Sequence, residues 1–285
     1  MGRIIACIDG SEHADSVCRL SSWVAKKTEI GISILHVAEP HSDVEAKVDC
    51  TGTIGLDAKN ELQKELTEID EAHGKEEQRK GQFIINQANN EFASKNITNV
   101  ESLHRRGSLQ ETLLDLEPEA ELIIMGKRGE NSSNKSGKLG PNLENIARSI
   151  HKPLLVATRD AKPIEKFLIA YDGSESSKKA LEYVINSPLL KGLECHLLKV
   201  CEESGEAEAL LEEAKNKLAK AGFSVNANLQ KGRPVEKVVS DYTKENNIDL
   251  LVIGAYGHSK IRSLILGSVT TALIHKSSIP VLLFR

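Results

Sequence analysis

The chain has 285 residues, of which 40% are hydrophobic and 27% are charged, and its formal net charge at pH 7 is −4. This length suits two domains, each large enough to bury its own core. The acidic balance argues against broad binding to nucleic acid or to an anionic membrane, and no apolar stretch approaches the length of a membrane span. We therefore expect neither kind of partner.

The N-terminus and the cysteines indicate a cytoplasmic protein. Residues 3–9 read as a short strand and not as a signal peptide. The five cysteines are odd in number and lack CxxC spacing, which is typical of free thiols in a reducing compartment. None of the nine histidines pairs with a cysteine at ligand spacing, so we expect no metal site.

Apolar runs predict the strands of the first half of the chain. The first run ends at Asp9 and the second at Val37, and two more cover residues 122–126 and 153–156. Between the last two, Gly140-Pro141 opens a predicted helix.

A charged segment at residues 40–95 separates the second predicted strand from the third. Its apolar residues recur at helical spacing, which predicts a long, mostly solvated helix over residues 57–95. Gly74 and Gly81 are the points at which this helix would be interrupted. The apolar positions are not sustained as heptads, so a coiled-coil partner surface is the less favoured interpretation.

A polar, proline-bearing linker at residues 159–164 divides the chain into predicted domains at residues 1–159 and 164–285. In the second of these, apolar runs alternate with helical segments, which predicts a parallel sheet covered on both faces. The runs fall at residues 167–171, 195–200, 223–229, 250–254 and 280–284, and the helical segments near 175–187, 206–221, 234–246 and 268–277.

The two halves are an internal repeat. The matched segments are residues 4–12 with 168–175, 34–37 with 197–200, 106–108 with 231–233, 122–129 with 251–257, and 151–156 with 278–283. Asp9 and Asp172 are 163 positions apart, whereas Gly107 and Gly232 are 125 apart. The first half therefore contains 38 additional residues between its second and third strands, and a duplicated domain is indicated.

The second half carries the pattern of a phosphate cradle. Gly254 and Gly257 follow an apolar run, and after nine more residues Gly267 and Ser268 open a helix. The unbonded amides and the positive dipole end of such a helix favour phosphate, and Ser268 and Thr270 add hydroxyl donors. The sequence contains no GxxxxGK[ST], so this is not a P-loop.

Basic side chains on the intervening loop would add positive charge: His258, Lys260 and Arg262. A solvated basic loop is the equally weighted alternative for these three residues.

Asp9 and Asp172 end strands at the edge of the sheet where ligands bind, and each could accept a hydrogen bond from a ribose or an adenine. The alternative is that each aspartate caps the following helix.

Val37 and Val200 end the second strands of the two halves and could line a base pocket, although plain core valines would also fit.

With these motifs the chain resembles the universal stress proteins of the tandem type, over nearly its whole length apart from the helical insertion. ATP-binding members of that family carry G-x2-G-x9-G-[ST], which Gly254, Gly257 and Gly267 with the next serine match without a gap.

The resemblance implies two tandem doubly wound α/β domains of the adenine nucleotide alpha-hydrolase-like type. Each would be a five-stranded, mostly parallel sheet with helices on both faces. It also implies ATP as the ligand, with or without Mg. The residues that it assigns to the cofactor are Tyr171, Asp172 and Val200 near the adenosine, Gly254 near the ribose, and Gly257, His258, Gly267, Ser268, Val269 and Thr270 near the phosphates.

The first half departs from this pattern. Ten residues separate Gly129 from Gly140, and Pro141 replaces the serine or threonine. Proline has neither an amide hydrogen nor a hydroxyl, so two phosphate donors are lost at one position. Glu144, in the first helical turn, would compete with phosphate. We expect weak binding of nucleotide or none in this half.

The leading functional prediction is an ATP-binding stress-response protein that acts as a regulator or binding module. Nothing in either half looks like a general base beside a nucleophile, so at most a weak ATPase is expected. The alternatives are a slow nucleotide hydrolase or adenylyl-transferring enzyme, which would usually show HxGH or a Ser-Gly-Gly loop, and a non-nucleotide interaction protein that uses the charged helix. We also expect an intramolecular pseudo-dimer through residues 154–157 and 281–284, with a further homodimer left open.

Overall fold

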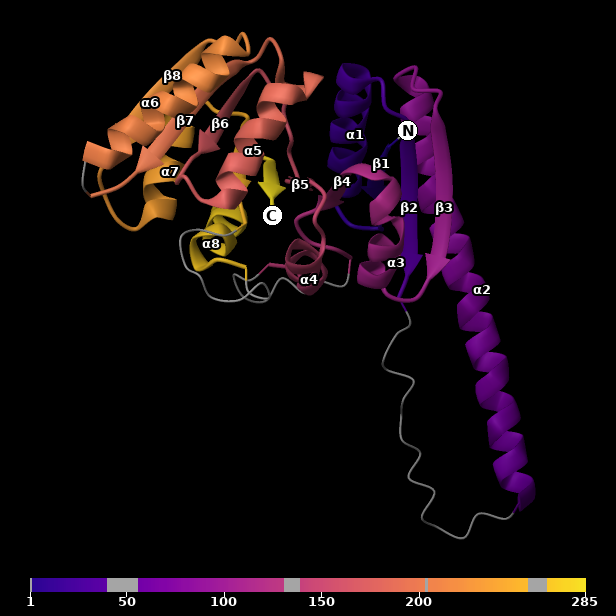
Figure 1. Ribbon diagram of the computed structural model, residues 1–285. Helices are drawn as coiled ribbons and strands as arrows, with labels where there is room; N and C mark the ends of the chain where they lie inside the picture. The colour runs from indigo at the N-terminus through magenta and orange to yellow at the C-terminus, as the bar shows by residue number, and fades with distance from the viewer. Residues whose placement is uncertain (1, 40–55, 131–138, 203–204, 256–265) are drawn as a thin grey trace.

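The computed structural model describes residues 2–39, 56–130, 139–202, 205–255 and 266–285, and for residues 56–73 it describes the backbone alone. The described strands form one ten-stranded sheet in the order β3-β2-β1-β4-β5-β10-β9-β6-β7-β8 (Figure 1). The strands are β1 (Arg3–Cys7), β2 (Ile32–Ala38), β3 (Val100–Arg106), β4 (Ala120–Gly126), β5 (Leu154–Ala157), β6 (Lys166–Ala170), β7 (Glu194–Val200), β8 (Val225–Gln230), β9 (Leu250–Gly254) and β10 (Val281–Phe284).

Helices lie between successive strands, as expected for an alternating α/β chain. They are α1 (Ala14–Thr28), α2 (Leu56–Ser94), α3 (Leu109–Leu116), α4 (Pro141–Ser149), α5 (Glu175–Asn186), α6 (Gly205–Lys220), α7 (Val235–Glu245) and α8 (Ser268–Lys276), with short 3₁₀ turns η2 (Glu117–Glu119) and η3 (Pro188–Leu190). Residues 158–165 connect the two halves without helix or strand.

The two halves of the sheet have the same topology. In each, five parallel strands are ordered third, second, first, fourth, fifth. The halves join where β5 and β10 pair antiparallel, with Leu154 opposite Leu283 and Val156 opposite Val281. The predicted α/β class is therefore confirmed, and the two predicted five-stranded sheets are continuous with each other.

Each face of the sheet carries a hydrophobic core that runs through both halves. One core includes residues of α1, α2, α5 and α6, such as Val17 and Leu211, and the other includes residues of α3, α4, α7 and α8, such as Ile146 and Leu273. Successive strand residues alternate between the cores because neighbouring side chains of a strand point to opposite faces. Both cores lie beneath helices that begin at the carboxyl ends of strands, where a ligand would bind.

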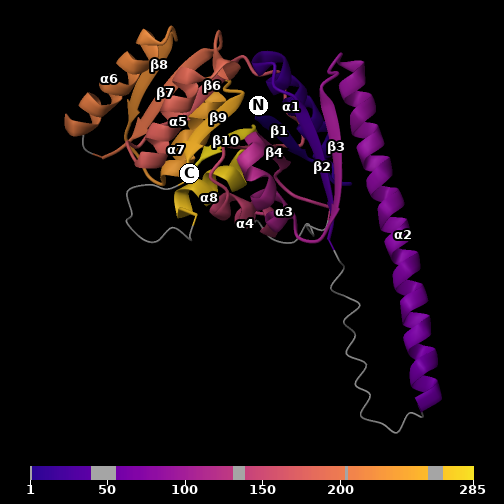
Figure 2. The same ribbon diagram turned by 45° about the vertical axis from the view of Figure 1, so that its right-hand side comes forward.

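The long insertion forms a single helix, α2, of 39 residues. The predicted interruption at Gly74 or Gly81 is wrong, because the helix continues through both positions. Its C-terminal part is also less solvated than predicted, since Ile85, Ala88 and Phe92 are buried against the sheet. The N-terminal part continues well beyond the ends of β2 and β3 (Figures 1 and 2).

Gly81 has a packing role that explains a glycine inside this helix. His36 and His104, on adjacent strands, stack with ring centroids 5.1 Å apart and an interplanar angle of 12°. A Cβ atom at Gly81 would overlap the ring of His104 and lie 2.9 Å from Nδ1 of His36. The missing side chain therefore lets α2 rest directly on the histidine pair, which offsets the low helix propensity of glycine.

Within the described residues, none of the helices combines the length with the apolar run that crossing a bilayer would need.

Candidate functional site

The predicted site of the second half lies where the strand order reverses. From β6 the chain moves to β7 on one side, and after β8 it crosses to β9 on the other side of β6. The carboxyl ends of β6 and β9 therefore flank a topological switch point, which is the usual ligand position in an open parallel sheet. Asp172 follows β6, Gly254 ends β9, and Gly267 comes immediately before α8.

Gly254 is required by packing. A Cβ atom at this position would overlap Oγ of Ser176 and lie 2.8 Å from the backbone nitrogen of Ser177. The end of β9 thus approaches the first turn of α5 so closely that no side chain fits between them. Fixed backbone atoms cannot move aside as a flexible side chain would, so this contact accounts for the glycine without any ligand.

Gly267 is different, because packing against the described residues gives only a weak reason for a glycine there. Its φ of −58° and ψ of 141° are open to any residue. A Cβ atom there would first meet the carbonyl oxygen of Ala255 at 3.3 Å, a tight contact that a backbone shift of a few tenths of an ångström would relieve. Because Gly267 has no side chain, another group could approach its backbone closely from this side.

The N-terminus of α8 presents backbone amides. No side chain of the described residues caps it, and Ser268 and Val269 at its first two positions are exposed. The first amides of a helix have no partner within the helix. Together with the positive end of the helix dipole, they form a ready site for an anion.

The hydroxyl of Thr270 already has protein partners. Thr270 is 6% exposed, and its Oγ1 lies 3.2 Å from the carbonyl oxygen of Gly254 and 3.1 Å from that of Ala255. The hydroxyl thus ties α8 to the end of β9. Because a hydroxyl carries one hydrogen, it is the backbone amide of Thr270 that would serve a phosphate.

Asp172 forms a turn at the end of β6. Its Oδ1 accepts a hydrogen bond from the amide of Ser174 at 2.9 Å. The helix that follows is capped by Ser174, whose hydroxyl accepts from the amide of Ser177 at 3.3 Å. The residue that caps α5 is thus Ser174, which argues against the capping interpretation of Asp172.

A buried lysine that sequence reasoning missed supports this turn. Lys199, in β7, is 8% exposed, and its Nζ donates to the backbone carbonyl of Asp172 at 3.0 Å. The signal was present, since a lysine between apolar residues of a strand, here Leu198 and Val200, requires a polar partner. Val200, the next residue, is half-buried at the end of β7.

The other predicted residues fall in two groups. Tyr171 is 5% exposed in the core next to α5, and burial raises its pKa. Gly257 and His258, and with them Lys260 and Arg262, lie outside the described residues. The structure thus brings the strand ends and the start of α8 together, and it leaves the intervening loop undescribed.

The equivalent place in the first half is a cavity of about 510 Å³. Asp9, Val37, Gly126 and Pro141 line it, as does one side of α2. Its size suits a small organic ligand. The helix start matches that of the second half, because Gly140 has φ −58° and ψ 138°, but Pro141 occupies the first helical position.

The polar lining of the first-half cavity is mixed: Asp9 is engaged by backbone amides, whereas Nδ1 of His13 and Nδ1 of His36 are buried without a hydrogen-bond partner among the described residues. The carboxylate of Asp9 accepts hydrogen bonds from the amide of Ser11 at 3.1 Å and from that of Glu130 at 3.0 Å. The glycine turn of this half therefore folds directly onto the aspartate. Glu144, expected to compete with phosphate, forms an ion pair with Arg148 on the next turn of α4.

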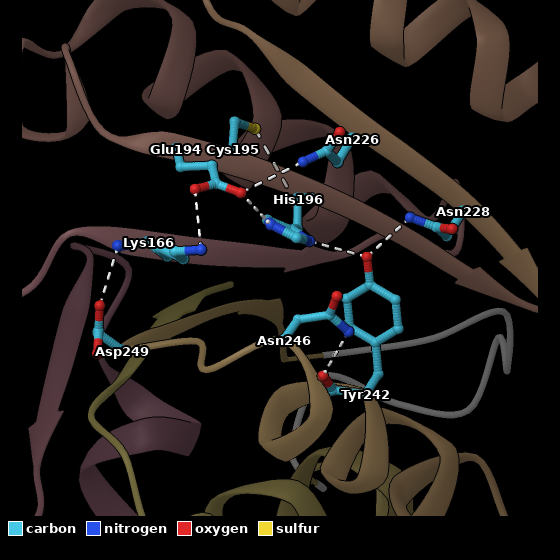
Figure 3. Close-up of polar contacts among 9 residues, drawn as sticks. All are labelled: Lys166, Glu194, Cys195, His196, Asn226, Asn228, Tyr242, Asn246 and Asp249. Atoms are coloured by element: carbon cyan, nitrogen blue, oxygen red, sulfur yellow. Dashed lines mark hydrogen bonds and ion pairs between the residues drawn. The ribbon is translucent and has the colours of Figure 1, made fainter.

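A polar cluster lies on the α7 side of the sheet in the second half (Figure 3). His196 joins Tyr242 through Nδ1 at 2.8 Å and Glu194 through Nε2 at 2.9 Å. Asn228 donates to the same tyrosine oxygen at 2.7 Å. Tyr242 is 4% exposed, and its hydroxyl oxygen is hydrogen-bonded to both His196 and Asn228. The cluster therefore anchors α7 to the edge of the sheet.

The family model described as "Universal stress protein family" matches residues 1–158 and again residues 163–285. The universal stress protein Slr1230 of Synechocystis is 38% identical over 288 residues, covering the full length of both chains. A crystal structure of a universal stress protein from Archaeoglobus fulgidus superposes with a TM-score of 0.69 at 20% identity, over 99% of this chain and 96% of that one. A universal stress protein solved in complex with cAMP is 23% identical over 44% of this chain and 98% of its own, with a TM-score of 0.38.

Proposed function

Because the chain belongs to the universal stress protein family, we propose that it is a stress-response protein that binds ATP in its second half. In this proposal the bound nucleotide makes the protein a regulator or binding module, and turnover is slow or absent. The observation that carries the proposal is the start of α8, where no described side chain caps the first amides and where packing against the described residues gives only a weak reason for Gly267.

The phosphates would bind at this helix start. The amides of Ser268, Val269 and Thr270 occupy the first turn of α8, and the hydroxyl of Ser268 is exposed. Several backbone donors converging on one point stabilise a polyanion more than scattered side chains do, because they are already oriented. Gly257 and His258 would complete the cradle from the loop, and Mg would screen the phosphate charge.

The adenosine would lie over the ends of β6 and β7. The carboxylate of Asp172 follows β6, and Val200 ends the neighbouring strand with its side chain half-buried. A carboxylate that accepts from a ribose hydroxyl, next to an apolar surface for the base, is a common arrangement at a switch point. Lys199 would hold the turn that carries Asp172 in place.

The first half would bind ATP far more weakly. Pro141 removes one amide and one hydroxyl donor at the helix start. Each hydrogen bond to a charged group is worth about 1.5–3 kcal/mol, so the two together correspond to a loss on the order of a hundredfold or more in affinity.

A slow hydrolase is the second candidate, and it would use the same site. Among the described residues around Gly254 and Gly267, the polar side chains include hydroxyls, the carboxylate of Asp172 and the amine of Lys199, which pair with nearby backbone groups. This arrangement suits binding more than activation of a nucleophile, which needs a base within hydrogen-bond reach. Metal-dependent release of phosphate from ATP would favour the hydrolase.

The test is calorimetry on two matched double variants of the full chain. Gly267→Val with Ser268→Ala fills the space beside the α8 amides and removes one hydroxyl. The control, Gly140→Val with Pro141→Ala, changes the same two positions in the first half. We expect ATP binding to be abolished by the first and unchanged by the second. ATP bound by the first variant with the affinity of the original chain would show that the site is wrongly assigned.

A further inference from the structure

The glycine turn of the first half reaches across to the second half through one lysine. Lys127 stands between Gly126 and Gly129, in the segment that would have formed a nucleotide loop. Its Nζ donates to the carbonyl oxygen of His275 at 2.5 Å and to that of Ser277 at 2.9 Å. Both acceptors belong to the C-terminal end of α8, which lies 148 positions or more away along the chain.

This contact gives hydrogen-bond donors to backbone carbonyls at the C-terminal end of α8. The last carbonyls of a helix have no partner within it, and the negative end of the dipole favours a cation there. Burial and the neighbouring Arg128 lower the pKa of Lys127 to about 8, so most of the amine is still charged at pH 7. Lys127 and Arg128, after burial, also lower the pKa of His275, as expected for cations placed beside this helix end.

The same helix begins at the proposed ATP site. With nine residues, α8 is about 13 Å long, so its two ends move together as a rigid body. Its N-terminal end is tied to β9 by the hydroxyl of Thr270, and its C-terminal end is held by Lys127. A side chain of the other half therefore contacts the same helix whose first amides would face the proposed ATP.

Among the described residues, no side chain of the second half makes the equivalent contact to α4. The residue that corresponds to Lys127 is Ala255, because each donates its amide to the last residue of the neighbouring strand. Lys127 donates to Ala157 at 2.9 Å, and Ala255 donates to Phe284 at 2.6 Å. Alanine has no amine, so the second half cannot support α4 in this way. The half with the altered cradle thus supports the half with the intact one.

We infer that Lys127 is a positioning residue for the ATP site of the second half. It holds α8 by its C-terminal carbonyls and so aligns the amides at the other end of the helix. The inference rests on the proposed function, since it concerns the affinity of that same site. It assigns a role to the altered glycine turn of the first half. The repeat alone would suggest only that this turn is a former nucleotide-binding loop.

The experiment compares three variants of the full chain. Lys127→Met keeps the length of the side chain and removes the amine, and Lys127→Arg restores donors to the carbonyls. Lys244→Met is the matched control, because Lys244 is an exposed lysine in the last turn of the neighbouring helix α7. ATP affinity is measured by calorimetry, and the protection of α8 amides by hydrogen exchange without nucleotide.

We expect Lys127→Met to weaken ATP binding by about fivefold or more. It should also speed exchange in α8, while Lys127→Arg restores much of both properties and Lys244→Met changes neither. If the original chain binds ATP and Lys127→Met binds it with the same affinity, the inference is overturned. If the original chain binds no ATP, the proposed function fails, and unchanged α8 exchange in Lys127→Met would separately show that the lysine does not hold the helix.

Discussion

The two glycines of the site should respond to alanine in opposite ways. In Gly254→Ala the new methyl group would overlap Oγ of Ser176 and lie 2.8 Å from the backbone nitrogen of Ser177. Overpacking of this kind costs about 1–3 kcal/mol. At about 2–4 °C for each kcal/mol, the melting temperature should fall by roughly 2–12 °C.

Gly267→Ala should leave stability nearly intact and weaken ATP binding. The nearest atom to the new methyl group is the carbonyl oxygen of Ala255 at 3.3 Å, and the φ of −58° suits alanine. We expect a stability change below about 1 kcal/mol, because the neighbouring atoms need to move only slightly. A methyl group in the space proposed for a phosphate should cost about tenfold in affinity, which is about 1.4 kcal/mol.

Urea unfolding and calorimetry on both variants measure these effects separately. The reasoning is refuted if Gly267→Ala loses as much stability as Gly254→Ala, or if it binds ATP as tightly as the original chain. The first result would mean that packing explains both glycines. The second would mean that nothing approaches Gly267 when ATP binds.

Three further predictions concern the rest of the molecule. Equilibrium titration should give about one tight ATP site per chain, and two equal tight sites would contradict the asymmetry caused by Pro141. Tyr242→Phe should lower the free energy of unfolding by about 1–3 kcal/mol in urea, because His196 and Asn228 lose a buried partner; an unchanged midpoint would argue against the cluster in Figure 3. In Lys127→Met the pKa of His275 should rise in an NMR titration, because a nearby cation is removed, and a constant pKa would place the lysine elsewhere.

The sequence allowed most of the fold to be predicted because strand and helix signals are local. The apolar run predicted at residues 250–254 is β9, and the helix expected near 268–277 is α8. Because the second half repeats the first, the same succession of strands and helices could be predicted for both halves. Local signals failed at α2, where Gly81 argued for a break, because the stacked histidines that explain it come from two distant strands.

The site was less predictable for the same reason. The motif placed Gly254, Gly267 and Thr270 together, but the motif could not separate a glycine required by packing from one that leaves space. It also gave Thr270 a phosphate role without showing that its hydroxyl bonds to β9. Lys127 and Lys199 act through contacts with residues far along the chain, and no spacing pattern records such contacts.

Photoaffinity labelling with 8-azido-ATP, followed by peptide mapping of the full chain, tests the central claim most directly. A label at the proposed site would lie on peptides between residues 170 and 271, and excess ATP would compete it away. We predict that the label is found there and is lost when Gly267→Val is combined with Ser268→Ala. Label confined to peptides around Gly126 and Gly140 would place the nucleotide in the first half and contradict the account.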